Sequence, residues 1–242
     1  MNLEIKDICL TINKKAIVRN VSISVSPGEI VGLLGPNGAG KTSTFNIAVG
    51  NLIPNKGNVS LNNRLITNLS LPERSRLGLG YLPQESSIFR DLTVRQNIEL
   101  ALKSSDLSNS IIRSRREKII KEFNLIKFID SYGYQLSGGE RRRCEIARAL
   151  SVGMNGPKYL LLDEPFAGID PLAVNDLKNI IVRLSKSGVG ILITDHNVRE
   201  TLLITNKSYV LSEGRILAYG LSNEVAKNEI VKRFYLGADF SL

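Results

Sequence analysis

A glycine-rich segment early in the chain has the composition of a phosphate-binding loop. The segment is GPNGAGKTS, and it follows the apolar run EIVGLL. Glycines let successive backbone N–H groups point inward around a phosphate, a lysine supplies charge to the terminal phosphates, and a threonine hydroxyl can ligate Mg²⁺. These last two roles fall to Lys41 and Thr42. The predicted loop comprises Gly35, Pro36, Asn37, Gly38, Ala39, Gly40, Lys41, Thr42 and Ser43.

Two adjacent carboxylates end a second apolar run, YLLLDEP. Ligands of open α/β sheets bind at the carboxyl ends of the strands, which is where Asp163 and Glu164 fall. One carboxylate can hold Mg²⁺ and the next can polarise an attacking water, so we assign Asp163 to the metal and Glu164 to the general base. The alternative is that both only cap a helix that starts near Pro165.

Gln84 and His196 follow two further predicted strands, in LGLGYLPQ and GILITDH. His196 is the single histidine of the chain, and its strand end predicts a place near a terminal phosphate, where a neutral imidazole can sense or hold that group. Gln84 could contact the metal or the attacking water and report the nucleotide state to the residues that follow it. A purely structural histidine and an ordinary surface glutamine are the alternatives.

The stretch LSGGERRRCEIARAL predicts a second anion-binding site. Ser137, Gly138 and Gly139 stand where a helix should begin, and bare N–H groups at a positive helix end suit a phosphate. The stretch contains no lysine. It is therefore predicted to clamp a phosphate that is already held elsewhere, and to bind only while that phosphate remains.

The remaining sequence predicts an α/β fold that places these residues at strand ends. Short apolar runs flanked by helical patterns are typical of parallel strands buried on both faces. The first two strands, joined by Asn13-Lys14-Lys15, should instead form an antiparallel ribbon. Strands are predicted at Leu3–Ile12, Ile17–Val25, Glu29–Leu34, Gly57–Leu61, Gly80–Leu82, Tyr159–Asp163, Gly190–Thr194, Lys207–Ser212 and Arg215–Tyr219.

The domain organisation is predicted to be a single nucleotide-binding domain over residues 1–242. A mostly helical segment at about 86–137 interrupts the order of the strands and is interpreted as an inserted subdomain, and a helical extension is expected at about 222–242. Cys9 and Cys144 have no metal-ligand spacing and are expected in or near the core.

Composition narrows the possible partners. The chain has 242 residues, of which 43% are hydrophobic and 23% charged, and no apolar run reaches the roughly 18–20 residues that span a bilayer. The first residues, MNLEIKDICL, lack a signal-peptide pattern, so the protein should stay where it is made. The net charge of +9 comes from scattered residues, which favours a solvated surface with some attraction to membranes; no nucleic acid partner is expected.

The order of these motifs resembles that of the ATP-binding cassette (ABC) ATPases over nearly the whole chain. The resemblance rests on GPNGAGKTS, Gln84, LSGGE, YLLLDEP, Gly168-Ile169-Asp170 and His196. It implies ATP and Mg²⁺ as ligands and a homodimer in which Ser137, Gly138 and Gly139 of one copy contact the nucleotide of the other, while Asp170 helps to couple the two sites. The sequence is consistent with such a homodimer, because each chain has one lysine-containing phosphate loop and one LSGGE segment.

Two features depart from the family pattern. The early hairpin of the family usually offers an aromatic residue that stacks on adenine, whereas the matching position here is Ile12, which can give apolar contact only. The segment SVGMNGPK, between the LSGGE helix and the YLLLDEP strand, is long and is expected to be a lengthened surface loop.

Within the family, several strings resemble the ATPases of lipopolysaccharide exporters: YLPQESSIFRDLTVRQNI, ITDHNVRETL and the terminal VKRFYLGADFSL. That resemblance implies two separate permease subunits contacted around Phe89 and Arg90, a C-terminal run that supports the dimer, and a peripheral position on the cytoplasmic side of the inner (plasma) membrane. The alternatives are the ATPase of a branched-chain amino-acid importer and an ABC ATPase with no role in transport.

Overall fold

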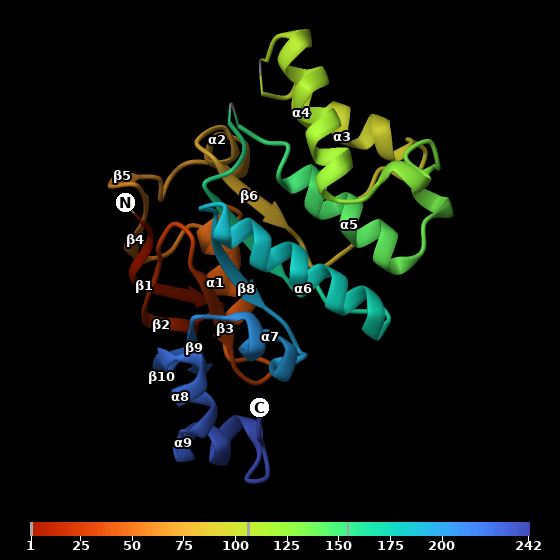
Figure 1. Ribbon diagram of the computed structural model, residues 1–242. Helices are drawn as coiled ribbons and strands as arrows, with labels where there is room; N and C mark the ends of the chain where they lie inside the picture. The colour runs from red at the N-terminus through yellow and green to blue at the C-terminus, as the bar shows by residue number, and fades with distance from the viewer. Residues whose placement is uncertain (1, 106, 154) are drawn as a thin grey trace.

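The computed structural model describes residues 2–105, 107–153 and 155–242, and it contains two sheets and a group of helices (Figure 1). Met1, Asp106 and Met154 lie outside the described residues. Among the described residues, no helix is both long enough and apolar enough to cross a membrane.

The central sheet has six strands in the order β10-β9-β3-β8-β7-β6. Strands β9, β3, β8, β7 and β6 run parallel, and β10 is antiparallel to β9. Every residue of β3, β7 and β8 is buried, which explains the uninterrupted apolar runs. The strands are β3 (Ile30–Leu34), β6 (Leu79–Leu82), β7 (Tyr159–Asp163), β8 (Gly190–Thr194), β9 (Lys207–Ser212) and β10 (Arg215–Leu221).

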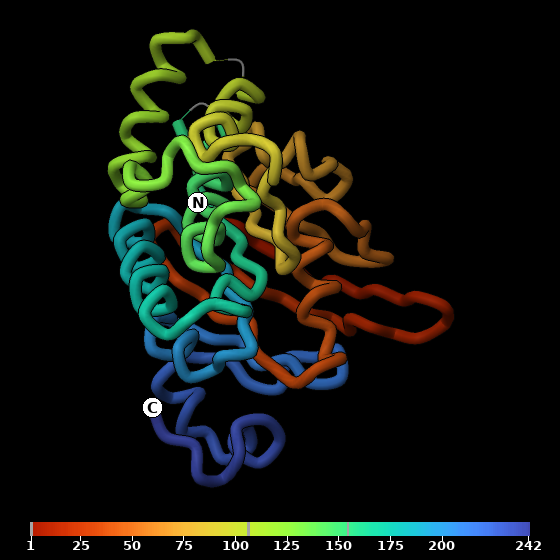
Figure 2. The backbone as a smooth tube through the Cα atoms, turned by 90° about the vertical axis from the view of Figure 1, so that its right-hand side faces the viewer, coloured from red at the N-terminus to blue at the C-terminus, as the bar shows by residue number. Residues whose placement is uncertain are grey.

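The second sheet is antiparallel, in the order β2-β1-β4-β5. It begins with a ribbon of β1 (Leu3–Ile12) and β2 (Lys15–Val25), the red hairpin that extends from the body in Figure 2. Asn13 and Lys14 form its turn with positive φ angles of 48° and 63°. Strand β4 (Lys56–Leu61) pairs with β1, and the two-residue β5 (Arg64–Leu65) was not predicted. The predicted α/β fold with an antiparallel ribbon is confirmed.

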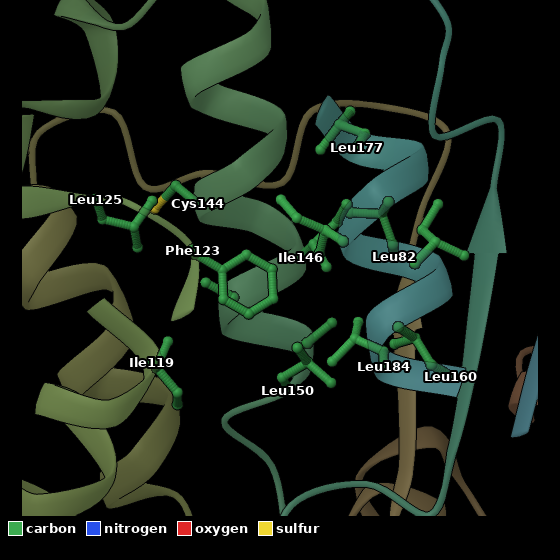
Figure 3. Close-up of a cluster of buried hydrophobic side chains, with 14 of the residues drawn as sticks. Leu82, Ile119, Phe123, Leu125, Cys144, Ile146, Leu150, Leu160, Leu177 and Leu184 are labelled. Carbon is green, nitrogen blue, oxygen red and sulfur yellow. The ribbon is translucent and has the colours of Figure 1, made fainter. Parts of the chain in front are cut away.

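Three helices follow β6 and precede β7: α3 (Val94–Lys103), α4 (Asn109–Glu122) and α5 (Gly138–Ala149), with the short turns η1 (Ile126–Phe128) and η2 (Gly133–Gln135) between α4 and α5. They lie together beside the sheet (Figure 1). Their apolar side chains share one core with α6 (Pro171–Lys186) and the sheet, and Figure 3 shows Ile146 and Leu150 of α5 between Phe123 and the α6 residues Leu177 and Leu184. Cys144 is buried in this core and Cys9 is half-buried, as expected.

The remaining helices are α1, α2 and α7 and the C-terminal helices after β10. Helix α1 (Lys41–Val49) and α2 (Leu71–Arg76) follow β3 and β5, and α7 (Val198–Ile204) follows β8. After β10 come α8 (Ser222–Lys227), α9 (Glu229–Val231) and the short π-helix η3 (Lys232–Leu236), which lie together at the bottom of Figure 1. Val225, Ala226 and Val231 pack with Leu202 in a small separate core.

The segment SVGMNGPK differs in part from the expected surface loop. Asn155 and Lys158 are exposed, but Ser151, Gly153 and Pro157 are buried. The reason is that Arg115 of α4 reaches across and donates to the Gly153 carbonyl at 2.6 Å, which draws this end of the segment against the helices.

Candidate functional site

The predicted phosphate loop follows β3, and its glycines adopt backbone conformations that other residues avoid. Gly38 and Gly40 have φ angles of 78° and 99°, and Gly35 has 144°. A Cβ on Gly35 would lie 2.2 Å from the carbonyl oxygen of Leu211, so only glycine fits there. A Cβ on Gly38 would meet no atom within 4 Å, and Pro36, Asn37 and Gly38 are exposed. The middle of the loop is therefore open to solvent, whereas Ala39 and Gly40 are buried.

Lys41 begins α1, and its ammonium lies within the loop. Nζ donates to the carbonyl oxygens of Gly35 at 2.6 Å and Pro36 at 3.0 Å. Burial lowers the pKa of Lys41, and the charges of Glu164 and Asp163 oppose that shift. A buried ammonium whose hydrogen bonds within the described residues go to carbonyl oxygens is suited to an anion, so the loop fits a phosphate group. Thr42 is exposed at the start of the helix and Ser43 is half-buried.

Three of the predicted catalytic side chains meet at the carboxyl ends of the parallel strands. Glu164 follows β7, and its Oε1 lies 2.8 Å from Nε2 of His196, which follows β8. Its other oxygen, Oε2, accepts a hydrogen bond from Nε2 of Gln84 at 3.0 Å. The Glu164 carboxylate is thus held between the two residues. The Glu164 side chain is only 10% exposed, whereas the His196 side chain is 58% exposed.

The backbone of Glu164 is also unusual. Its φ of 49° lies in the left-handed region, which costs energy for a residue other than glycine. The Glu164 N–H donates to the Thr194 carbonyl at the end of β8, 2.8 Å away, which fixes the turn. Such conformations persist only where the surroundings hold them, and they concentrate at functional sites.

Asp163 ends β7 in a buried position beside Glu164. Burial, reinforced by the Glu164 carboxylate, raises the pKa of Asp163 to about 6, although Arg142 and Lys41 oppose the shift. Two neighbouring carboxylates with so little solvent attract a cation, and Mg²⁺ needs only one or two protein carboxylates when phosphates and water supply the other ligands. The site therefore fits a magnesium–nucleotide, although no cluster of three or more potential metal-ligating side chains occurs among the described residues.

Asp195 was missed from the sequence. It is buried between Thr194 and His196, and its carboxylate accepts the backbone N–H groups of Asn197 and Phe166, both at 2.8 Å. Burial raises the pKa of Asp195, while these two hydrogen bonds oppose the shift. Its contacts join the residues after Glu164 to the residues around His196, so it fixes their relative position. Asp195 could have been identified from the sequence as a carboxylate residue directly after the strand GILIT.

Helix α5 begins at the residues predicted to form the second anion site, with Ser137 at the N-cap and Gly138 as the first helical residue. Ser137 caps the helix: its Oγ accepts the Glu140 N–H at 3.3 Å, and the Glu140 carboxylate accepts the Ser137 N–H at 2.9 Å. A Cβ on Gly139 would lie 2.7 Å from the Cβ of Ala173, next to Asp170, which caps α6. No hydrogen bond or ion pair of the described residues joins this group to the phosphate loop.

Two further predicted contact positions are at the surface. Ile12 is exposed at the end of β1, opposite Lys15 in the hairpin. Phe89 and Arg90 are both exposed, and the Phe89 ring lies under the guanidinium of Arg148, 4.6 Å from ring centre to Cζ. The Phe89 N–H donates to the side-chain oxygen of Asn97 at 3.0 Å, which ties this segment to α3.

The fold and the loop-and-carboxylate site define an ATPase, and comparison with known proteins gives the family. A family model described as ABC transporter matches residues 18–167, which is more than half of the chain. The chain therefore belongs to the ABC transporter family, and it is an ATP-binding subunit that hydrolyses ATP. The resemblance stated from the order of the motifs is confirmed.

Individual relatives are similar over almost the full length. The lipopolysaccharide export system ATP-binding protein LptB of Escherichia coli (strain K12) is 49% identical over 241 residues, with 99% of each chain covered. The protein of the same name from Haemophilus influenzae is 46% identical over 241 residues, again with 99% of each chain covered. Among solved structures, the ADP conformation of MJ1267, an ATP-binding cassette of an ABC transporter, has a TM-score of 0.87 at 27% identity, covering 98% of this chain and 99% of that one.

Proposed function

We propose that this chain is the motor subunit of an exporter of lipopolysaccharide or a related glycolipid, and that it works as a dimer on separate membrane subunits. The observation that carries the proposal is the Glu164 carboxylate held between Gln84 and His196 beside the phosphate loop. The export assignment is supported by relatives named as lipopolysaccharide export ATP-binding proteins, at 45% to 49% identity.

Each residue of the site has a role in this proposal. ATP bound with Mg²⁺ would supply the phosphoryl group that water attacks. Glu164 accepts the proton of that water, and its neighbours Gln84 and His196 hold its two oxygens in a fixed direction. Lys41 neutralises phosphate charge, and Thr42, Asp163 and Gln84 are the groups that would hold the metal.

The second anion site completes the nucleotide site of a partner copy. Ser137, Gly138 and Gly139 are placed at a helix N-terminus with a serine cap, which presents backbone N–H groups to a phosphate. Since one chain carries one phosphate loop and one such helix start, two copies give two complete sites. Asp170, which caps the adjacent helix α6, is the residue that would couple them.

The membrane subunits are proposed to bind around Phe89 and Arg90, both exposed on the segment between Gln84 and α3. The protein would then lie on the cytoplasmic face of the inner membrane, where its net charge of +9 favours contact with anionic lipid. Residues 86–137 form a helical subdomain in this proposal, and residues 222–242 a C-terminal extension that supports the dimer.

Substitution of the proposed base tests the mechanism. Glu164→Gln should lower kcat by at least about 10²-fold, because an amide cannot accept the proton of the attacking water, while ATP should convert the variant into a dimer in size-exclusion chromatography. The exposed Glu117→Gln on α4 is the matched control. Turnover near that of the unmodified protein in the Glu164 variant would remove Glu164 as the base.

Affinity purification from the native host tests the transport assignment. The tagged chain is recovered from gently solubilised membranes, and stoichiometric partners are identified by mass spectrometry. Two permease subunits with components that bridge to an outer envelope are expected. Amino-acid permeases with a binding protein would assign the chain to an importer, and soluble partners alone would assign it to a role other than transport.

A further inference from the structure

Helix α5 carries a buried arginine that the nucleotide chemistry does not itself require. Arg142 is 6% exposed, and each of its three guanidinium nitrogens donates a hydrogen bond. Nε donates to the carbonyl of Pro165 at 3.2 Å and Nη1 to that of Pro83 at 3.0 Å. Nη2 donates to the carbonyls of Asp163 at 2.9 Å and Glu164 at 2.7 Å. The guanidinium therefore binds the backbone on both sides of the Glu164 carboxylate.

Glu145, one helical turn further along α5, links this guanidinium to a second segment. Its Oε2 lies 3.1 Å from Nη1 of Arg142, and its side chain is buried. Its Oε1 accepts hydrogen bonds from Ser86 Oγ and the Ser87 N–H, each at 2.8 Å, and from the Ile88 N–H at 3.2 Å. These residues directly precede Phe89, so the pair connects the Phe89 segment to the backbone of Glu164.

The geometry of the pair suits a rigid connection. The guanidinium is a planar fork whose donors have fixed directions, so a shift of the fork moves all of the carbonyls that it holds. Removing charges from water is expensive, and well-packed apolar residues are often at least as stable as a buried ion pair, so stability alone does not account for this pair. The contacts that this pair makes are with functional segments, which indicates a positioning role.

Glu164 needs such a support. Its left-handed backbone is strained and must be held by its surroundings. One side is held by the Glu164 N–H bond to Thr194 on β8, and the other by the bond from Arg142 to the Glu164 carbonyl. If Arg142 moves, the direction of the Glu164 side chain changes with the backbone.

We propose that Arg142 and Glu145 are positioning residues that align the Glu164 carboxylate according to the position of the Ser86–Ile88 segment. This inference rests on the proposed function, in which Glu164 is the base and the adjacent Phe89 and Arg90 contact the membrane subunits. A partner that shifts residues 86–88 thereby changes the rate of hydrolysis through two side chains, without contacting the nucleotide.

The test compares kinetic constants with thermal stability in the full-length purified protein. Arg142→Lys keeps the charge but has one nitrogen instead of three, so kcat should fall about 10- to 100-fold, while KM for ATP stays within about twofold. Glu145→Gln keeps the shape and an acceptor oxygen for Ser86, and should lower kcat by about 3- to 10-fold with the melting temperature nearly unchanged. If Arg142→Lys does not fold, the kcat and melting temperature of Glu145→Gln test the positioning role.

A double-variant cycle separates positioning from general support. Since the two residues act as one unit, Arg142→Lys combined with Glu145→Gln should lose about as much kcat as Arg142→Lys alone. The control is Arg74→Lys. Arg74 of α2 is also buried, and among the described residues its hydrogen bonds go to backbone carbonyls, two of them at the C-terminal end of α1. Its variant should lower the melting temperature and leave kcat near that of the unmodified protein.

Three results would overturn the inference: a kcat of Arg142→Lys and of Glu145→Gln within about twofold of the unmodified protein, losses that multiply in the double variant, or an equal kcat loss in the Arg74 control. Failure of the proposed function has a different signature. If Glu164→Gln retains full turnover, the base is another group and the inference falls with it. If Glu164→Gln is inactive while both α5 variants turn over normally, only the positioning role is refuted.

Discussion

The ionised carboxylate of Asp163 destabilises the ligand-free fold, and its removal should show this directly. Asp163 is buried beside Glu164, and its pKa rises from 3.8 to about 6. A shift of about two pKa units corresponds to about 3 kcal/mol between the charged and neutral forms. Asp163→Asn keeps the shape of the side chain and removes the charge, so the variant should be more stable by up to about 3 kcal/mol near neutral pH while losing ATP hydrolysis.

The sign of the pH dependence follows from the direction of the shift. The folded-state pKa of Asp163 lies above the unfolded value, so as pH falls the folded protein takes up this proton first. The penalty is therefore present in full above about pH 6 and is relieved as pH falls toward about 4. The advantage of Asp163→Asn should be about 3 kcal/mol at pH 8 and about half of that at pH 5.

The measurement is urea-induced unfolding followed by circular dichroism, with EDTA present and no nucleotide. Thermal unfolding should agree, with a rise of about 2–4 °C for each kcal/mol in a chain of this size. Asp130→Asn is the control, because the Asp130 side chain is 76% exposed and its change should stay within about 0.5 kcal/mol. Equal stability of Asp163→Asn and the unmodified protein at pH 8, or a gain that does not change with pH, would refute the reasoning.

Three other substitutions test separate parts of the structure. His196→Ala should lower kcat by about 10²-fold in a steady-state assay, because it removes the group that holds one Glu164 oxygen; an unchanged rate would make His196 structural. Arg74→Leu removes the side-chain hydrogen bonds to the carbonyls of Thr67, Leu69, Ile47 and Ala48 and should cost about 3 kcal/mol of unfolding free energy in urea, whereas an unchanged midpoint would contradict this. Ile12→Tyr should lower KM for ATP by about fivefold if adenine stacks there, and an unaltered KM would place adenine elsewhere.

The buried strands could be predicted because their sequences are continuous apolar runs. Strands β7 and β8 match the predicted Tyr159–Asp163 and Gly190–Thr194 residue for residue, since a run that is apolar on both faces has sharp ends. Strand β5 could not be found, because two exposed residues carry no periodicity. It exists only because Asn62 and Asn63, both with positive φ, fold the chain back onto β4.

The site was predicted as far as it depends on strand ends. Gln84, Glu164 and His196 each follow one of the parallel strands of the central sheet, so their meeting is a consequence of the topology. The contacts of Arg142 and Glu145 depend on how α5 lies against the sheet edge, which no local pattern fixes. The available signal was two opposite charges three residues apart on the face that also carries Gly139 and Ala149, the buried face of the helix.

Several energetically unfavourable features coincide at one edge of the sheet. Asp163 is a buried carboxylate with a raised pKa, Lys41 is a buried ammonium with a lowered pKa, and Glu164 has a strained backbone. Elsewhere in the chain, protein groups compensate a buried charge. The buried guanidinium of Arg74, for example, donates to the carbonyls of Ile47 and Ala48 at the end of α1. At this edge of the sheet, the charges of Lys41, Asp163 and Glu164 compensate one another only in part. A phosphate beside Lys41 and a cation beside Asp163 would reduce these costs together, so the same residues that weaken the ligand-free fold give the nucleotide-bound form its advantage.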